Sequence, residues 1–285
     1  MRDAEDVVWL ECQLDRIASR DADHLAVTGD LLDRWNPSLL SRALDAFASR
    51  AWLDPERLTI LHGNHDLASS GGHPRRGADL WRLATRFWDP PALVMWRQRR
   101  FYRAIARRSG SSGPPVAHPS PFSKTLETGV RIAVLDTVAR PRTPFSLRGG
   151  AIILHHALGC IPRSQTDWLL QQSSRPVPLV ILMHHLPLGT PGFTWKPNPF
   201  WGVHLPDVHV PMHVDEEDRA RFWAAAHGAS ARLVLCGHVH RARLEWKDGI
   251  AVGVNGQSGA AWAGRTIAFY SVDDERVTMR MERVE

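Results

Sequence analysis

Four short apolar segments of this chain each end in side chains that commonly bind metal ions. The segments are residues 25–30, 58–66, 179–185 and 232–240. Apolar runs of about four to six residues bounded by Gly and polar turns are typical of buried strands. Because open sheets bind ligands just outside their strand ends, we expect one rim to collect the metal-binding side chains. These are Asp30, Asn64, His184, His238 and His240.

This mixture of side chains restricts the metals that could bind. Carboxylate, imidazole and amide oxygen together suit borderline divalent ions such as Mn, Fe, Co, Ni or Zn. Two such ions about 3.5–4 Å apart that share one carboxylate form a clamp for phosphate esters, and Asp30 is the best candidate for the shared ligand. Gly29, Gly63 and Gly237 each precede a predicted ligand, where a residue without Cβ lets the backbone approach closely.

The order and spacing of these motifs resemble those of the calcineurin-like metallophosphoesterases. The motifs are Gly29-Asp30-x-x-Asp33, Gly63-Asn64-His65-Asp66, His184-His185 and Gly237-His238-x-His240. The middle of the chain, with Val134-Leu-Asp-Thr137 and Gly159-x5-Gln165-x-x-Trp168-Leu169, is similar to the phosphodiesterase branch of that family. The resemblance implies an α/β fold, a layered β-sandwich flanked by helices.

The resemblance also implies a role for each matching residue. Asp30 would bridge two divalent ions, and His240 would belong to the first ion's site. Three residues would complete the second site, namely Asn64, His184 and His238. His65 would be the general acid or transition-state stabiliser, because an imidazole beside a metal ligand can protonate a leaving oxygen near neutral pH. Asp66 would orient the His65 ring.

These roles predict a hydrolase that cleaves a phosphodiester or phosphomonoester by direct attack of metal-bound hydroxide. A small-molecule phosphate ester is the expected substrate, and a phosphodiesterase is favoured over a protein phosphatase. The alternative is a noncatalytic binding scaffold with the same fold and a degraded first metal site.

One family motif has no counterpart in this sequence. The family's first strand ends in Asp-x-His and supplies two ligands of the first metal, whereas here Val7, Leu10, Leu14 and Ile17 already have helical spacing. Two interpretations are open, a start codon assigned too late or a chain that has lost half of one metal site. We favour the first, because a missing strand would leave a sheet edge and part of the core uncovered. The first metal site is therefore incomplete in the chain as written.

Length and composition predict one large domain over residues 1–285, interrupted by a basic helical insertion or cap at about 67–121. Residues 75–108 contain ten Arg against two Asp. Their apolar side chains have helical spacing, with tryptophans between them: Leu80, Leu83, Phe87, Val94, Phe101 and Ile105, and Trp81, Trp88 and Trp96. The segment is either a solvated Arg face or a surface for an anionic substrate, a membrane or nucleic acid.

A second irregular segment, residues 191–213, follows the strand before His184 and is expected to overhang the site. Pro197, Pro199, Pro206 and Pro211 exclude a regular helix there. Six of its side chains could contact substrate, although ordinary loop packing is the default: Trp195, Phe200, Trp201, His204, His209 and His213. The role of His155-His156 is open, His24 is expected to be structural, and His62 is expected to pack beside Gly63.

The cysteines give an expectation about location. Cys12, Cys160 and Cys236 are an odd number without a Cys-x-x-Cys pair, which favours a reducing compartment over a disulfide framework. We therefore expect a cytoplasmic protein, with peripheral membrane contact left open through the basic segment. That expectation depends on the N-terminus being the true one.

Overall fold

The computed structural model describes most of the chain. The described residues are 1, 4–68, 89–110, 115–138, 145–154, 158–174, 177–189, 192–196, 206–255, 266–273 and 276–283.

The N-terminal part pairs two helices with two parallel strands. Its elements are α1 (Ala4–Ala18), β1 (Leu25–Thr28), α2 (Pro37–Ala48) and β2 (Leu58–Leu61). Helix α2 begins where the Asn36 side chain accepts a hydrogen bond from the Leu39 amide at 3.1 Å, with Pro37 in the first turn. Leu14, Leu44, Phe47 and other apolar side chains of these elements form one buried cluster.

A six-stranded mixed sheet forms the centre of the fold. It has the order β11-β12-β10-β7-β4-β3. The strands are β3 (Phe122–Thr125), β4 (Arg131–Val134), β7 (Leu179–Leu182), β10 (Ala231–Cys236), β11 (Arg243–Lys247) and β12 (Ile250–Val254). Strands β4, β7, β10 and β12 are parallel, and the outer two run antiparallel to them.

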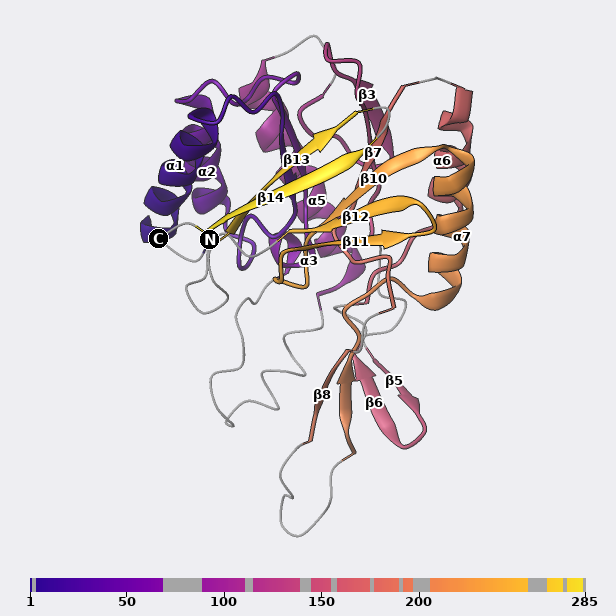
Figure 1. Ribbon diagram of the computed structural model, residues 1–285. Coiled ribbons are helices and arrows are strands. Elements are labelled where there is room, and N and C mark those ends of the chain that lie inside the picture. Colours follow the sequence, from indigo (N-terminus) through magenta and orange to yellow (C-terminus); the bar gives the residue numbers. More distant parts are fainter. Residues whose placement is uncertain are drawn as a thin grey trace.

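Apolar side chains cover both faces of this sheet, as the continuous apolar runs predicted. One face packs against α6 (Arg163–Leu170), the short 3₁₀ helix η1 (Gln171–Ser174) and α7 (Glu216–Gly228). The antiparallel pair β13 (Thr266–Val272) and β14 (Val277–Arg283) packs on the other face through Tyr270, Val272 and Val277. Helices α1 and α2 lie on one outer side of the molecule and α6 and α7 on the opposite side (Figure 1). The predicted layered α/β sandwich is confirmed.

The basic insertion contributes helix α5 (Pro91–Ser109). Phe101 and Ile105 are fully buried in the same cluster as α1 and α2, so α5 packs as part of the domain core. The other side of the helix is exposed and basic, with Arg99, Arg100, Arg103, Arg107 and Arg108. The first predicted helix, with Leu80, Leu83, Phe87, Trp81 and Trp88, lies outside the described residues.

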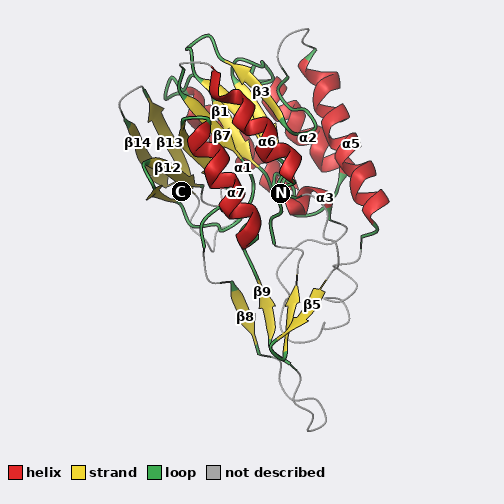
Figure 2. Cartoon of the chain, turned by 90° about the vertical axis from the view of Figure 1, so that its right-hand side faces the viewer, coloured by secondary structure: helices red, strands yellow, loops and turns green. Residues whose placement is uncertain are grey.

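A small four-stranded sheet projects from the body (Figures 1 and 2). Its order is β5-β6-β9-β8, from β5 (Phe145–Arg148), β6 (Ala151–Leu154), β8 (Phe193–Trp195) and β9 (Val208–Val210). The prediction that residues 191–213 are irregular is therefore wrong for β8 and β9, which pair with each other. Phe200, Trp201, His204 and His155-His156 lie outside the described residues. Within the described part of the chain, no helix is long and apolar enough to cross a membrane.

A cavity of about 1250 Å³ lies between β1 and the β13–β14 pair. Among the described residues, strand β1 pairs with β2 on one side, and its other edge faces this cavity. The floor consists of apolar side chains of the six-stranded sheet: Ile132, Val180, Leu182, Leu233 and Leu235. One end is lined by Asp30, His65, His238 and His240, so the cavity opens onto the predicted metal site.

Candidate metal centre

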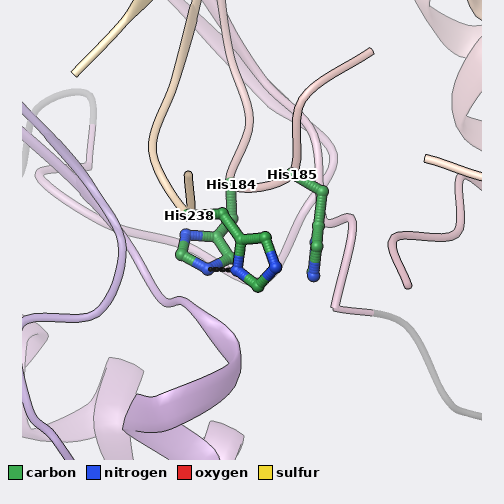
Figure 3. A group of neighbouring side chains, drawn as sticks. All are labelled: His184, His185 and His238. Carbon is green, nitrogen blue, oxygen red and sulfur yellow. Dashed lines mark hydrogen bonds between the residues drawn. The ribbon is translucent and has the colours of Figure 1, made fainter. Parts of the chain in front are cut away.

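Four of the five predicted ligands converge around one nitrogen atom. His184 Nε2 lies 2.9 Å from Asn64 Oδ1, 3.1 Å from His238 Nδ1 and 3.3 Å from Asp30 Oδ2. These residues follow β1, β2, β7 and β10, whose carboxyl ends meet at this point. Figure 3 shows the His184 and His238 rings next to each other, with the contact between their nitrogens drawn as a dashed line. Four of the predicted ligands therefore lie together at the ends of these strands, and their binding of a metal ion stays a prediction.

A backbone contact orients the His184 ring. Its Nδ1 lies 2.8 Å from the Thr28 carbonyl oxygen, which can only accept a hydrogen bond. Nδ1 therefore carries a proton, so Nε2 is the ring atom that could offer a lone pair to a metal ion. This contact also ties β7 to the end of β1.

The donor set fits a divalent ion. Ligand atoms at about 2.0–2.2 Å from one ion and about 90° apart are separated by roughly 3 Å, which agrees with the distances around His184 Nε2. The Nε2 atom of His238 is buried and has no hydrogen-bond partner among the described residues. Burial, together with the neighbouring His184, holds the pKa of His238 well below its usual value, so this ring is neutral. A neutral imidazole is the form that binds metals.

The carboxylate of Asp30 is ionised in this environment. Burial acts to raise its pKa, but the His184 and His65 rings beside it hold the pKa well below the usual value. Its Oδ1 accepts a hydrogen bond from the His65 amide at 3.0 Å, while Oδ2 faces His184. The His65 amide thus fixes the carboxylate so that Oδ2 lies beside His184, where it would be available to a metal ion.

Two glycines make the close approach of these strands possible. Gly29 has φ +97°, and a Cβ there would lie 2.5 Å from His184 Nδ1. A Cβ on Gly63 would lie 2.6 Å from His184 Cε1 and would also collide with the Asp30 carboxylate. The prediction that these glycines permit close backbone approach is confirmed.

His65 and Asp66 lie beside this centre with different partners. His65 Nδ1 is 3.1 Å from the Asp33 carbonyl oxygen, and about a third of its side chain is exposed. The fully buried Asp66 accepts hydrogen bonds from the Gly63 and Leu32 amides, each at 2.7 Å. The expectation that Asp66 orients the His65 ring is therefore corrected, because the Asp33 backbone makes that contact and Asp66 fixes the two turns.

His240 lies on the wall of the cavity, together with Asp30 and His65. It is separated by one residue from His238, and both have positive φ, 57° and 65° respectively. These are the positions where the sequence predicted the first metal site, with Asp30 and His240 as its ligands.

No role was predicted for His185, which the structure places in the same group. Ligand atoms of His184, His185 and His238 all lie within 4.8 Å of one another, and all three residues are buried (Figure 3). His185 Nδ1 contacts Thr137 Oγ1 at 2.9 Å. In the sequence, the adjacent pair His184-His185 is the feature that could have indicated His185 as a member of this group. The middle motif stabilises the backbone next to this contact, since Gln165 Nε2 donates to the carbonyl of Asp136, the residue before Thr137, at 2.8 Å.

The other histidines singled out in the sequence lie outside this group. His24 contacts the Glu56 carbonyl and the Thr59 hydroxyl, in the structural role expected. His62 is buried against the rings of Phe101 and Tyr102. His209 Nδ1 lies 2.7 Å from Thr194 Oγ1 in the projecting sheet. The backbone of His213 pairs with that of Leu186 in an isolated β-bridge.

Comparison with known proteins agrees with this geometry. The family model of the calcineurin-like phosphoesterases matches residues 6–242. The chain belongs to this family. Members hydrolyse phosphoesters with bound metal ions, and the buried histidine group could hold a metal ion here. A search of curated proteins found no significant match.

One solved structure of low sequence identity shows the same fold, and two further structures match with lower TM-scores. A dimetal phosphatase from Danio rerio has a TM-score of 0.56 and 12% identity, over 97% of this chain and 86% of that one. GAP50, described as the anchor in the inner membrane complex of Plasmodium, has a TM-score of 0.48 and 10% identity, over 97% and 74%. The phosphopantetheinyl hydrolase PptH from Mycobacterium tuberculosis has a TM-score of 0.36 and 15% identity, over 82% and 79%.

Proposed function

We propose that this phosphoesterase hydrolyses phosphodiesters of small molecules at the centre around His184. The convergence of Asp30, Asn64 and His238 on His184 Nε2, within 3.3 Å, is the observation that carries the proposal. Bound divalent ions would lower the pKa of water and offset the negative charge of the phosphoryl oxygens. Mn, Fe, Zn, Co and Ni all suit these ligands.

The chain's own residues would position and protonate the ester. His65 is the group that can reach a leaving oxygen, because its Nδ1 faces the Asp33 carbonyl and its Nε2 is left for substrate. The partial exposure of its side chain gives substrate access. Asp66 keeps the Gly63 turn in place, so it supports the site without touching the ester.

The resemblance of the middle motif to the phosphodiesterase branch supports a diester as the substrate class. Gln165 binds the Asp136 backbone through both amide atoms, to the amide and to the carbonyl, each at 2.8 Å. Thr137 contacts His185, and Gly159 lies directly against the His185 ring, where a Cβ would clash. These residues are those that resemble the phosphodiesterase branch, and Thr137 and Gly159 pack against His185, the neighbour of His184.

We also propose that a further strand, preceding residue 1, belongs in the cavity beside β1. The Met1 ammonium donates to the Leu31 carbonyl at 2.7 Å, and the Asp33 amide donates to the Met1 carbonyl at 2.8 Å. Helix α1 begins there and leads to β1. A strand that enters α1 from the cavity would make a β-α-β unit with β1 and end beside Asp30 and His240.

A pair of chromogenic esters tests the proposed activity. We expect the Mn-loaded chain to hydrolyse bis-p-nitrophenyl phosphate with a higher kcat/KM than p-nitrophenyl phosphate, and Asp30→Asn to abolish both reactions. A preference for the monoester would overturn the diesterase assignment. Hydrolysis of neither ester with any of the five metals would favour the noncatalytic scaffold.

A further inference from the structure

The segment from His62 to Leu67 carries three groups of the proposed site, and most of its hydrogen bonds are made with other parts of the fold. Helix α3 (Asn64–Leu67) is a single turn. Such a turn is too short to be stable alone, because most of its amides and carbonyls have no partner within the helix. Its geometry must therefore come from neighbouring elements.

Two adjacent residues of α5 reach both ends of this segment. At one end, Arg97 Nη1 donates to the Leu67 carbonyl oxygen at 2.7 Å, and it also donates to Asp89 at 2.8 Å. At the other end, Gln98 Nε2 lies 2.8 Å from His62 Nε2 and donates to Asp136 Oδ2 at 2.8 Å. Arg97 and Gln98 therefore hold the two ends of the His62–Leu67 segment.

A third contact from the same helix holds the neighbouring loop. The Trp96 ring packs edge to face against Trp35, with the centroids 6.3 Å apart. The Trp35 amide donates to the Ala68 carbonyl at 2.8 Å, directly after α3. Residues 96 to 98 thus contact the segment and the loop that follows Asp30.

These polar contacts do more than attach the helix. The buried side chains of Phe101 and Ile105 already fix α5 to the core. Arg97 is only 6% exposed, and a guanidinium loses hydration when it is buried. Hydrogen bonds from Arg97 compensate that loss of hydration. Because hydrogen bonds are directional, they restrict the position of Leu67 more than apolar packing does.

We propose that Arg97 and Gln98 are positioning residues, and that α5 acts as a brace that sets the placement of Asn64 and His65. The inference rests on the proposed function, because the brace matters for a metal ligand and a proton donor. Displacement of such groups by about 1 Å can lower turnover by roughly 10²-fold.

Variants of two arginines on the same helix test the brace. Arg97→Met removes the donors and keeps the apolar stem, Arg97→Lys keeps one charged nitrogen, and Arg108→Met is the matched control. Arg108 pairs with Asp45 and Ser41 on the surface, away from α3. Gln98→Met tests the other end, and thermal melting identifies any variant that fails to fold.

We expect Arg97→Met and Gln98→Met to lower kcat and weaken Mn binding, each by about 10-fold to 100-fold, with KM changed much less. Arg97→Lys should recover most of both quantities, and Arg108→Met should match the wild type. A wild-type kcat and Mn affinity in Arg97→Met, or an equal loss in Arg108→Met, would overturn the brace. A wild-type chain that binds no Mn and hydrolyses nothing would refute the proposed function itself, and the brace with it.

Discussion

Three predicted metal ligands have strained backbones. Asp30, His238 and His240 have φ of 56°, 65° and 57°. Each such conformation costs a non-glycine residue about 1 kcal/mol or more and persists only where its surroundings fix it. At Asp30 and His238 those surroundings are the close approach of Gly29 and Gly237 to neighbouring strands. Four other described residues that are not glycine also have positive φ, so this strain is not confined to the ligands: Asp21, Ala51, Ser230 and Asp248.

At the residue scale, His65 provides a test of catalytic role. His65→Ala should lower kcat by about 10²–10⁴-fold, the usual contribution of a positioned acid or base, while Mn content stays at the wild-type level. The reason is that the ring contacts the Asp33 carbonyl and is absent from the atoms around His184 Nε2.

Steady-state kinetics and metal analysis of the same preparations would measure this. His227→Ala, on the outer helix α7, is a suitable control and should leave both quantities unchanged. If His65→Ala lost its metal together with its activity, His65 would have to be assigned as a ligand.

At the scale of elements, the apolar runs predicted the strand ends well because buried strands leave a strong pattern. The four strands before the ligands follow that pattern closely. The projecting sheet was missed, since β8 and β9 have three residues each and lie among prolines that suggested a loop. The sequence also left unpredicted which helix partners Leu67 and His62, because contacts across thirty or more residues have no local pattern.

His24 couples the start of β1 to β2 and should make folding sensitive to acid. Burial lowers its pKa to about 4, against about 6.5 for an unfolded histidine. Above pH 6.5 both states are neutral and the contribution is fully present. As the pH falls from 6.5 towards 4, the unfolded state binds the proton first, so about 2–3 kcal/mol of stability is lost.

Denaturant unfolding between pH 7 and pH 4.5 measures this loss. In His24→Gln the free energy of unfolding should fall less steeply with acid than in the wild type, whatever its value at pH 7. The exposed His118→Gln should retain the wild-type slope. An unchanged slope in His24→Gln would show that His24 does not titrate as burial requires.

At the scale of the whole molecule, a cavity of about 1250 Å³ lies beside β1. Extending the chain upstream with the residues encoded in frame before Met1 should raise the Tm by more than about 5 °C, or roughly 2 kcal/mol for a chain of this size. It should also add a second tightly bound ion, because the new strand would end beside Asp30 and His240.

A Gly/Ser extension of equal length is the matched control, since it cannot fill an apolar cavity. Thermal melting and metal analysis would compare the two chains. Equal Tm values and equal ion counts for both extensions would contradict the proposed strand and favour a chain with only one complete metal site.

Calorimetric titration of Mn²⁺ into the metal-stripped chain tests the central claim most directly. We predict one tight site per chain, because four ligands surround one position whereas only Asp30 and His240 are assigned to the other. His184→Ala should remove this site, and His118→Ala should leave it unchanged. Absence of tight binding in the wild type, or undiminished binding in His184→Ala, would contradict the metal centre on which the proposed hydrolysis depends.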